Sequence, residues 1–275
     1  MTLFSKFKEI STNQEKLVEP TAQLSIESQA SEVEHMISLI VPVYNEESKI
    51  SALVAHVKDI LRESLHDYEI LIINDGSTDN TMQLIEVEKK LDNRVKAISY
   101  VQNEGKGHAV KTGVLESSGD IVLFLDGDFD ISPNEIRNYI KELDGCDLVI
   151  ASKAHPLSNV VCPSHRRLLS KLYSLFVRVI VGIRVKDTQS GLKVGNGNTL
   201  RKIFEYTSTK GYAFDVELLA LATRFDLKIK ELPININLSS SFRIHEIAKM
   251  FIDTLRISYK LRIRKSYKKH LQETF

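Results

Sequence analysis

Short apolar runs alternate with amphipathic stretches along most of this chain, beginning near residue 37. Five apolar runs predict buried strands, over 37–43, 68–73, 95–101, 121–125 and 147–152. Between them, apolar residues at helical spacing predict helices over about 46–64, 80–91, 107–117 and 132–145. Strands that alternate with helices are typical of βαβ units. The pattern therefore predicts an α/β fold with a mainly parallel central sheet flanked by helices.

The alternation is less regular beyond residue 152. Helices are expected over 168–180, 214–223 and 244–264, turns with a short strand over 186–197, and one strand over 227–238. The first of these helices should stop by Gly182. Its apolar face can pack on the core or lie on a membrane surface; that face comprises Leu168, Leu169, Leu172, Leu175, Phe176, Val179 and Ile180.

The last helix carries many cations beside an apolar stripe. The stripe comprises Ile247, Phe251, Leu255 and Ser258 or Tyr259. Apolar residues beside clustered Lys and Arg favour contact with an anionic membrane surface or a partner. We therefore expect three parts: a mobile polar extension over 1–35, a main α/β domain over 36–240, and a basic amphipathic helix within 241–275.

Composition narrows the classes of function. The net charge of +1 gives no general attraction to nucleic acid. Two cysteines are too few for a disulfide framework or a zinc site. No apolar segment follows Met1 as in a signal peptide, and no stretch reaches the roughly 20 apolar residues of a membrane span.

Carboxylates gather where the fourth strand ends. Asp126 and Asp128 are one residue apart after an apolar run, and Asp130 continues the alternation. Hard divalent cations are commonly held by one or two carboxylates together with substrate phosphates. A calcium loop is excluded, because Ile131 and Arg137 stand where it needs glycine and glutamate. Metal binding is favoured over the alternative, solvated aspartates before the next helix.

Polar residues follow other strands as well. Asp75 lies in a turn where its carboxylate could accept hydrogen bonds from a nucleobase or ribose, although Asp79 or Thr78 in this turn could simply cap a helix. Lys106, between two glycines, could face a diphosphate. Ligands of parallel sheets lie beyond the carboxyl ends of the strands, where Tyr44 and Asp75 would meet the aspartates.

These motifs together resemble a known family. Pro42-Val-Tyr-Asn-Glu46, Asn74-Asp-Gly-Ser-Thr-Asp79, Asn103-Glu-Gly-Lys-Gly107 and Asp126-Gly-Asp128 stand in the order found in family 2 glycosyltransferases of the GT-A fold. In the second half, residues 166–170, 187–193 and 210–217 resemble the polyprenyl-phosphate branch, that is, dolichyl-phosphate mannose synthases and dolichyl-phosphate glucosyltransferases.

The resemblance implies a metal-dependent, inverting transfer of a hexose from a UDP- or GDP-sugar to a polyprenyl or dolichyl phosphate. It implies a nucleotide-sugar pocket lined by Pro42, Tyr44, Glu46, Asp75, Asp79, Lys106 and Asp126. It implies Mg²⁺ or Mn²⁺ held by Asp126, Asp128 and Asp130. It implies an acceptor-phosphate site formed by Lys153, Arg166, Ser170, Ser190 and Lys193. The residues expected to carry the catalysis are Asp126, Asp128, Arg166 and Asp187.

The resemblance implies two partners, the nucleotide-sugar donor and the lipid acceptor. The apolar helix over 168–180 and the basic last helix predict peripheral contact with the cytoplasmic face of a membrane, and a separate membrane-anchor subunit is a further candidate partner. Two alternatives stay open. A hydroxyl acceptor would need a carboxylate base, Asp187 or Asp215, whereas a phosphate acceptor is already ionised at neutral pH. A catalytically silent module that binds nucleotide sugars is the other alternative.

Overall fold

The computed structural model describes residues 35–62, 67–125, 136–238 and 244–262. The chain divides into two units, Met1–Glu34 and His35–Phe275, and the first lies outside the described residues. The mobile extension expected over 1–35 therefore stays a prediction. The segment 126–135, which carries the clustered aspartates, also lies outside the described residues.

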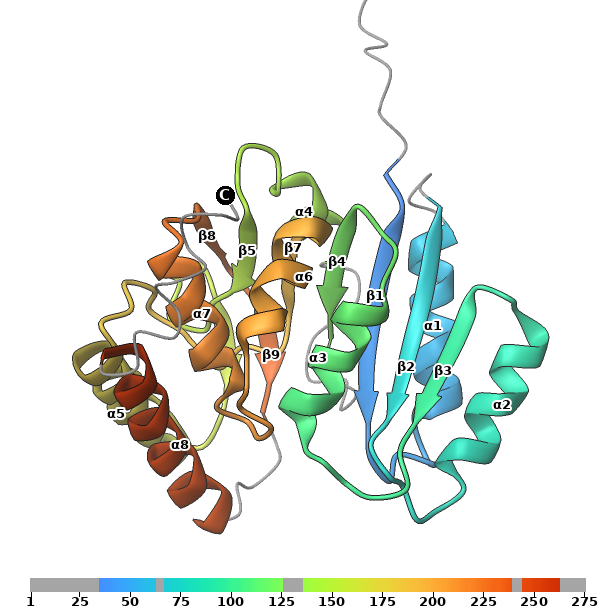
Figure 1. Ribbon diagram of the computed structural model, residues 1–275, viewed down its shortest axis with the longest axis horizontal. Coiled ribbons are helices and arrows are strands. Elements are labelled where there is room, and N and C mark those ends of the chain that lie inside the picture. The colour runs from blue at the N-terminus through green and yellow to red at the C-terminus, as the bar shows by residue number, and fades with distance from the viewer. Residues whose placement is uncertain (1–34, 63–66, 126–135, 239–243, 263–275) are drawn as a thin grey trace, which may run out of the picture. The chain divides into compact units, whose positions relative to one another are not determined.

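The second unit is built on a seven-stranded sheet in the order β3–β2–β1–β4–β7–β5–β8 (Figure 1). The strands are β1 (Ile37–Val43), β2 (Tyr68–Asn74), β3 (Val95–Ser99), β4 (Ile121–Phe124), β5 (Leu148–Ala151), β7 (Lys193–Asn196) and β8 (Ile229–Leu232). Strand β7 runs antiparallel to both β4 and β5, and the other pairs in this sheet are parallel. The predicted mainly parallel α/β fold is confirmed.

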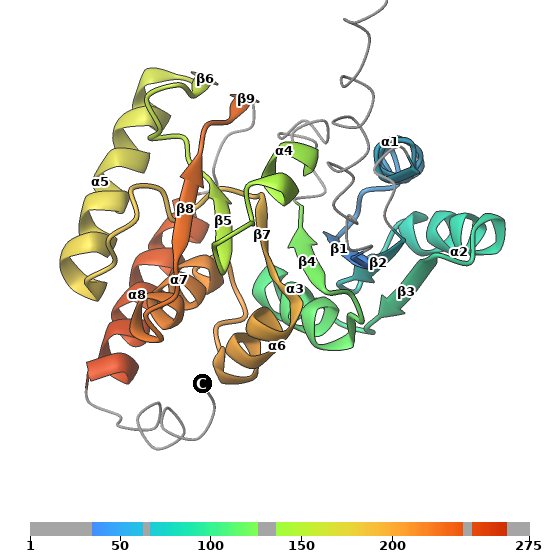
Figure 2. The same ribbon diagram turned by 90° about the horizontal axis from the view of Figure 1, so that it is seen from above.

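Helices cover both faces of this sheet (Figures 1 and 2). One face carries α1 (Ile50–Arg62), α2 (Thr81–Leu91) and α4 (Ile136–Lys141); the other carries α3 (Lys106–Glu116), α6 (Gly197–Tyr206) and α7 (Phe214–Arg224). Two longer helices, α5 (Ser164–Val181) and α8 (Ile244–Arg262), pack against each other beside α7. Successive side chains of a strand point to opposite faces of the sheet, so a strand contributes to the hydrophobic core on both faces. In β1, Leu39 and Val41 belong to one core cluster and Ile40 belongs to the other.

The register of β1 and β2 brings their carboxyl ends to the same edge. Val43 lies opposite Asn74, and Asn74 lies opposite Ser99 at the end of β3. In Figure 1 the arrowheads of β1 to β4 point to this lower edge. The loops that carry the predicted nucleotide-site residues therefore start from neighbouring points.

The predicted strand over 227–238 is wrong as a single element. It is divided by Pro233 into β8, which pairs with β5, and β9 (Asn235–Asn237), which pairs with β6 (Asn159–Val161) in a separate two-stranded sheet. Proline has no N–H to donate to a ladder, so the main sheet cannot continue through it. The prediction also lacked β6 and α6.

The predicted apolar face of 168–180 does not contain the buried residues of this helix. Those are Tyr173 and Val177, whereas Leu168, Leu172, Leu175 and Val179 of the predicted face are 60%, 53%, 57% and 67% exposed. The helix ends as predicted, with Gly182 in the left-handed region at a φ of 84°.

The predicted stripe of the last helix is partly wrong. Its buried face is formed by Thr254, Ile257, Ser258 and Leu261, whereas Leu255 and Tyr259 are 50% and 58% exposed. The Thr254 hydroxyl lies 2.9 Å from the Tyr173 hydroxyl of α5, in a buried contact. A polar pair rather than an apolar residue therefore joins these helices here.

Candidate functional site

The loops after β1 and β2 are joined by side-chain hydrogen bonds. Asn45, in the left-handed region at a φ of 55°, accepts a bond from the Thr78 amide at 2.8 Å and donates its own amide to Ser77 at 2.9 Å. Tyr44, just before it, is 46% exposed. The pairing leaves the Tyr44 ring at the edge of the sheet, free to contact a ligand.

Asp79 and Glu46 also form hydrogen bonds between the loops after β1 and β2. The Asp79 carboxylate accepts hydrogen bonds from the amides of Thr81 and Glu47, at 3.0 and 3.3 Å, and the Glu46 amide donates to the Thr81 hydroxyl at 2.8 Å. Burial alone would raise the pKa of the Asp79 carboxyl, but these bonds and the Thr81 hydroxyl hold that pKa below its ordinary value. Asp79 therefore organises the start of α2, as the helix-cap alternative expected, and its contact with nucleotide stays a prediction.

Asp75 is buried directly beyond β2. Its two carboxylate oxygens accept hydrogen bonds from the amides of Glu104 and Gly105, at 2.8 and 2.9 Å, and its own amide donates to Val43 at 2.9 Å. Burial is the largest influence on this group and raises the pKa of the Asp75 carboxyl, against the two amide bonds. A buried carboxylate that is held at the sheet edge by backbone bonds to Val43, Glu104 and Gly105 is suited to accept N–H or O–H groups of a ligand.

The glycines around Lys106 have a packing role. A Cβ on Gly107 would lie 2.5 Å from the Thr209 carbonyl oxygen, and the Lys210 carbonyl accepts the Gly107 amide at 2.7 Å. The segment 209–211 thus covers the first amides of α3. The Lys106 ammonium lies 5.8 Å from the centroid of the Tyr212 ring. Its predicted contact with a diphosphate stays a prediction, and the glycines themselves do not require one.

A hollow of ≈ 400 Å³ adjoins this segment. Its lining comprises Tyr100, Val101, Gln102, Glu104, His108 and Lys210. The Lys210 ammonium and the Glu104 carboxylate form an ion pair across it at 2.5 Å. Because the Glu104 amide binds Asp75, the hollow and the Asp75 carboxylate belong to one region.

The predicted metal ligands Asp126, Asp128 and Asp130 lie outside the described residues. The described chain reaches Leu125, which is buried and donates its amide to Ile40 at 3.1 Å. The described ranges contain no group of three side chains suited to hold a metal ion. The metal site therefore stays a prediction that rests on the sequence.

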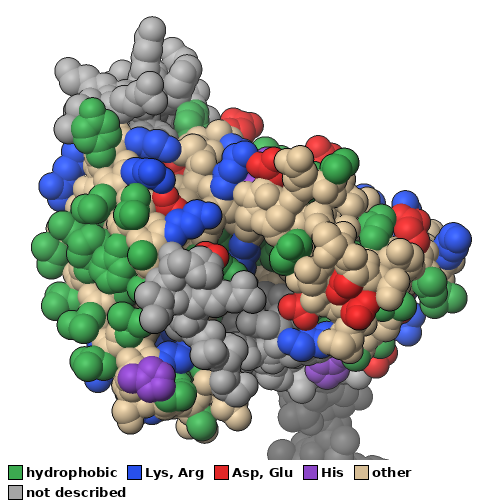
Figure 3. Space-filling model, turned by 90° about the horizontal axis from the view of Figure 1, so that it is seen from below, with side chains coloured by type: hydrophobic (Ala, Val, Ile, Leu, Met, Phe, Trp, Pro, Cys, Tyr) green, Lys and Arg blue, Asp and Glu red, His purple; other side chains and the backbone are tan. Residues whose placement is uncertain are grey.

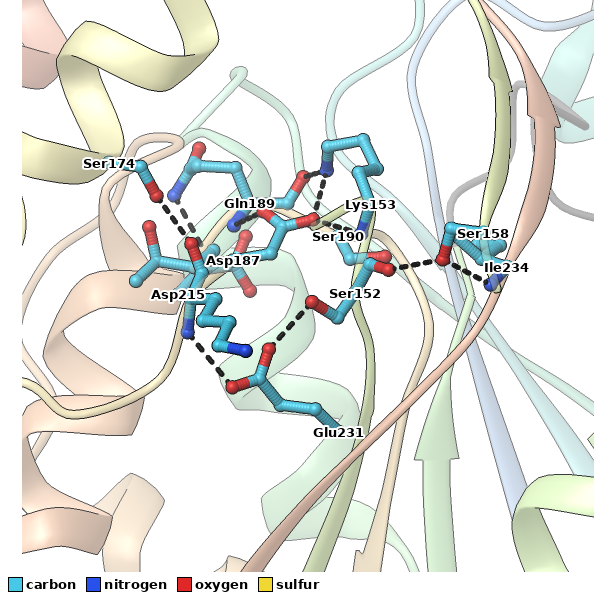
Figure 4. A network of polar contacts seen from close by, with 12 residues as sticks. Ser152, Lys153, Ser158, Ser174, Asp187, Gln189, Ser190, Asp215, Glu231 and Ile234 are labelled. Carbon is cyan, nitrogen blue, oxygen red and sulfur yellow. Dashed lines mark hydrogen bonds and ion pairs between the residues drawn. The ribbon is translucent and has the colours of Figure 1, made fainter. Parts of the chain in front are cut away.

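Asp187 lies at the centre of a network of polar contacts in the second half (Figure 4). One oxygen accepts the Lys153 amide at 2.7 Å and lies 2.9 Å from the Lys153 ammonium, and the other accepts the Gln189 amide at 3.0 Å. Burial would raise the pKa of the Asp187 carboxyl, but the Lys153 charge and these bonds outweigh it and lower that pKa. The structure thus brings together two predicted residues, Asp187 and Lys153.

Lys193 is fully buried rather than open to solvent. Its ammonium lies 2.6 Å from an Asp215 carboxylate oxygen, donates to the Ser190 carbonyl, and stands 5.4 Å from the centroid of the Phe124 ring. Ser190 is also buried, and its hydroxyl has no hydrogen-bond partner among the described residues. These contacts give Lys193 a structural role, and its binding of acceptor phosphate stays a prediction.

Arg166 and Ser170 lie on the first two turns of α5. Arg166 is partly buried and Ser170 is exposed. The neighbouring Arg167 donates to the Val160 carbonyl at 3.1 Å, which fixes the start of α5 against β6. Cations at a helix N-terminus oppose its dipole, an arrangement that a bound anion relieves.

Comparison with known proteins identifies the family of this chain. The model of the family described as glycosyl transferase family 2 matches residues 38–195. The chain belongs to glycosyl transferase family 2. It is 34% identical over 224 residues to the dolichyl-phosphate beta-glucosyltransferase of Saccharomyces cerevisiae (74% of this chain, 67% of the relative) and 32% identical over 214 residues to that of Dictyostelium discoideum (72% and 65%). The chain thus spans about two thirds of the length of these curated relatives.

Other relatives in the family extend the comparison. An undecaprenyl-phosphate mannosyltransferase of Micrococcus luteus is 28% identical over 200 residues, which cover 71% of this chain and 81% of the relative. The solved glucosyl-3-phosphoglycerate synthase of Mycobacterium tuberculosis, in complex with UDP, is 20% identical with a TM-score of 0.63, covering 82% of this chain and 79% of that one. The last likeness shows the GT-A fold alone.

Sequence reasoning missed two residues that bind the segments around Asp187 and Lys153. Glu231 accepts the Lys186 amide at 2.9 Å and the Ser152 hydroxyl at 2.6 Å, and Ser174 of α5 donates to the Lys186 carbonyl at 2.7 Å. Glu231 faces the site from an edge strand that the sequence showed only as part of one long run. The charged pair Lys230-Glu231 between Ile229 and Leu232 was the available signal.

Proposed function

We propose that this family 2 chain transfers a hexose from a UDP- or GDP-sugar to a polyprenyl phosphate, with inversion and with a divalent metal. The observation that supports a phosphate acceptor is that two candidate base carboxylates, Asp187 and Asp215, are each ion-paired with a lysine. Asp187 is ion-paired with Lys153 at 2.9 Å and Asp215 with Lys193 at 2.6 Å. A hydroxyl acceptor would need one of them as a base, and an ion-paired carboxylate is a weak one.

A phosphate acceptor fits these pairs better. A phosphate monoester has its second pKa near 6, so it attacks without losing a proton to the protein. It needs cations that orient it, and Arg166 at the start of α5 supplies one. Directly beyond it, Leu168, Leu172, Leu175 and Val179 form an exposed apolar face. One helix would therefore offer a cation to the phosphate and apolar side chains to the prenyl chain.

The donor would lie at the edge formed by β1, β2 and β4. The buried Asp75 carboxylate would accept hydrogen bonds from the nucleoside, beside Tyr44 and Pro42. Asp126 and Asp128, with Asp130 as a third candidate, would hold Mg²⁺ or Mn²⁺, which would neutralise charge on the departing nucleoside diphosphate. The Mycobacterium tuberculosis synthase was solved with Mn²⁺ and UDP-glucose, and also with Mg²⁺ and UDP, which supports this assignment of donor and metal.

Contact with a membrane would be peripheral. No described helix combines the length and the hydropathy that a membrane span requires. In Figure 3 hydrophobic side chains gather over the side of the molecule formed by α5 and α8. On α8 these are Ile252, Leu255 and Tyr259, each about half exposed. We expect this surface to contact the membrane that holds the acceptor; a separate anchor subunit stays a prediction.

Vesicle binding tests the membrane contact. Changing Leu172→Glu and Leu175→Glu together should abolish co-sedimentation with anionic vesicles, because both side chains would place charge in the apolar layer. Leu91→Glu is the control, since Leu91 is 74% exposed but lies on α2, across the sheet from α5. Equal binding of both variants would remove the α5 surface from the proposal.

Kinetics with lipid phosphate test the acceptor. Replacement of Arg166 by Gln should raise the KM for polyprenyl phosphate by about 10-fold or more, the scale of a lost charge-assisted hydrogen bond. The KM for nucleotide sugar should stay unchanged. Arg178→Gln removes the same charge from the exposed end of the same helix and should leave both constants near those of the parent. An unchanged KM for lipid phosphate in the Arg166 variant would point to a different acceptor.

A further inference from the structure

The segment of residues 186–190 has few regular backbone bonds, yet side chains from three other elements hold it (Figure 4). We call it the Asp187 segment. Both backbone groups of its first residue, Lys186, form hydrogen bonds. The Ser174 hydroxyl of α5 donates to the Lys186 carbonyl at 2.7 Å, and the Glu231 carboxylate of β8 accepts the Lys186 amide at 2.9 Å. Lys153, just beyond β5, binds the Gln189 carbonyl at 2.6 Å.

Glu231 is bonded to both chain segments that carry the Asp187–Lys153 pair. One carboxylate oxygen accepts the amide of Lys186, the residue before Asp187. The other accepts the hydroxyl of Ser152, the residue before Lys153, at 2.6 Å. A single side chain thus sets the spacing between the two residues whose charged groups meet at 2.9 Å.

The sheet does not need this carboxylate for its own pairing. Strand β8 pairs with β5 through the backbone, with Glu231 opposite Ile150 and Leu232 opposite Ala151. The Ser152 amide donates to the Leu232 carbonyl at 2.9 Å, which extends the ladder by one bond independent of the Glu231 side chain. Loss of the side chain would therefore loosen the Asp187 segment, which Ser174 and Lys153 would still bind, while leaving the strand in place.

We propose that Glu231 is a positioning residue for the sugar transfer: by binding Lys186 and Ser152 it keeps Asp187 and Lys153 in the geometry that the reaction uses. This inference rests on the proposed function. Ser174 acts on the same segment from α5, the helix that would bind the acceptor. Glu231 itself touches neither substrate, so its effect passes through the two residues it holds.

Two substitutions of Glu231 test whether its hydrogen bonds are needed for the reaction. Glu231→Ala removes both bonds and should lower kcat by about 100-fold, the scale of a misplacement of roughly 1 Å, while the KM for nucleotide sugar stays within about twofold. Glu231→Gln should recover most of the rate. Its amide oxygen can still accept the Lys186 amide, and its NH₂ can donate to the Ser152 hydroxyl, which accepts as well as donates.

Glu142→Ala is the matched control. It removes a carboxylate that is ion-paired with Lys230, the neighbour of Glu231 on β8, on the outer surface. It should leave kcat unchanged. A kcat for Glu231→Ala equal to that of the control, or a Gln variant as slow as the Ala variant, would overturn the positioning role.

Amide hydrogen exchange gives a readout that does not depend on turnover. In Glu231→Ala the amides of Lys153 and Gln189, both bonded to Asp187, should exchange faster than in the parent, while amides of β1 should not change. If the parent protein transfers no sugar to lipid phosphate, the proposed function fails, but faster exchange in the variant would still support the positioning of Asp187 and Lys153 by Glu231. Unchanged exchange at both amides would overturn this positioning role.

Discussion

Replacement of Lys193 by Met should destabilise the protein strongly, because it leaves a buried carboxylate without its cation. Lys193 is fully buried, Asp215 is 5% exposed, and their charged groups lie 2.6 Å apart. Removing one partner of a buried ion pair costs about 3–5 kcal/mol. A change of 1 kcal/mol in the free energy of unfolding shifts Tm by about 2–4 °C in a domain of this size, so the expected drop in Tm is about 6–20 °C.

The assays are thermal unfolding for Tm and urea unfolding for the free energy, on the parent, Lys193→Met, Asp215→Asn and the double variant. The double variant removes both charges, so it should be less destabilised than the sum of the single changes by about 1–3 kcal/mol. Lys230→Met serves as the control, because the Lys230–Glu142 pair is 43% and 46% exposed and should contribute no more than about 1 kcal/mol.

Two results would refute this reasoning. Additive effects in the double variant would show that the two charges do not interact. A Lys193→Met protein as stable as the parent, but with a raised KM for lipid phosphate, would show that Lys193 serves the acceptor rather than the fold.

Three further predictions follow from the structure and the family. Asp128→Ala should abolish turnover that depends on added Mn²⁺ or Mg²⁺ while leaving Tm within a few degrees, and a metal-dependent rate equal to that of the parent would contradict the metal role. Gly107→Ala should cost about 1–3 kcal/mol in urea unfolding, because its Cβ would meet the Thr209 carbonyl at 2.5 Å; a neutral effect would mean that the segment over α3 yields freely. Burial raises the pKa of the Glu69 carboxyl, but Lys96 and other hydrogen-bond partners outweigh burial and lower that pKa. The ionised Glu69 therefore stabilises the fold above pH ~4.5, and this stabilisation is lost as pH falls through the lowered pKa. Glu69→Gln should cost more stability at pH 7 than at pH 3, and an equal cost at both pH values would refute this pH dependence.

The parts of the fold that the sequence predicted are those where periodicity is unambiguous. Strands β1, β2, β4 and β5 are nearly continuous apolar runs because both of their faces are covered by helices. The alternation therefore predicted the sheet and the edge at which Tyr44 and Asp75 lie. The direction of β7 is set by long-range pairing with β4 and β5, and no local pattern encodes it.

The misses have local physical causes. Helix α6 begins at Gly197, and Asn196 caps it by accepting the Thr199 amide at 3.1 Å. The sequence Asn196-Gly-Asn198 is equally typical of a turn, which concealed the cap. The spacing of Leu200, Ile203 and Phe204, all buried, was the signal that favoured a helix.

The candidate site was predictable in its residue types but not in its contacts. Carboxylates and cations in the second half suggested phosphate chemistry. The pairing of Asp187 with Lys153, and of Lys193 with Asp215, joins residues from different elements, and no spacing in the sequence predicts it. In the proposed function, these pairs favour a phosphate acceptor over a hydroxyl acceptor.

Transfer of labelled sugar to two matched lipids tests the central claim most directly. Purified protein would be incubated with UDP-glucose or GDP-mannose, with Mn²⁺ or Mg²⁺, and with either a polyprenyl phosphate or the corresponding polyprenol. The account predicts label in the polyprenyl-phosphate fraction with at least one donor, lost on chelation of the metal, and none on the polyprenol. Equal labelling of the polyprenol, or no transfer to lipid phosphate from either donor, would contradict it.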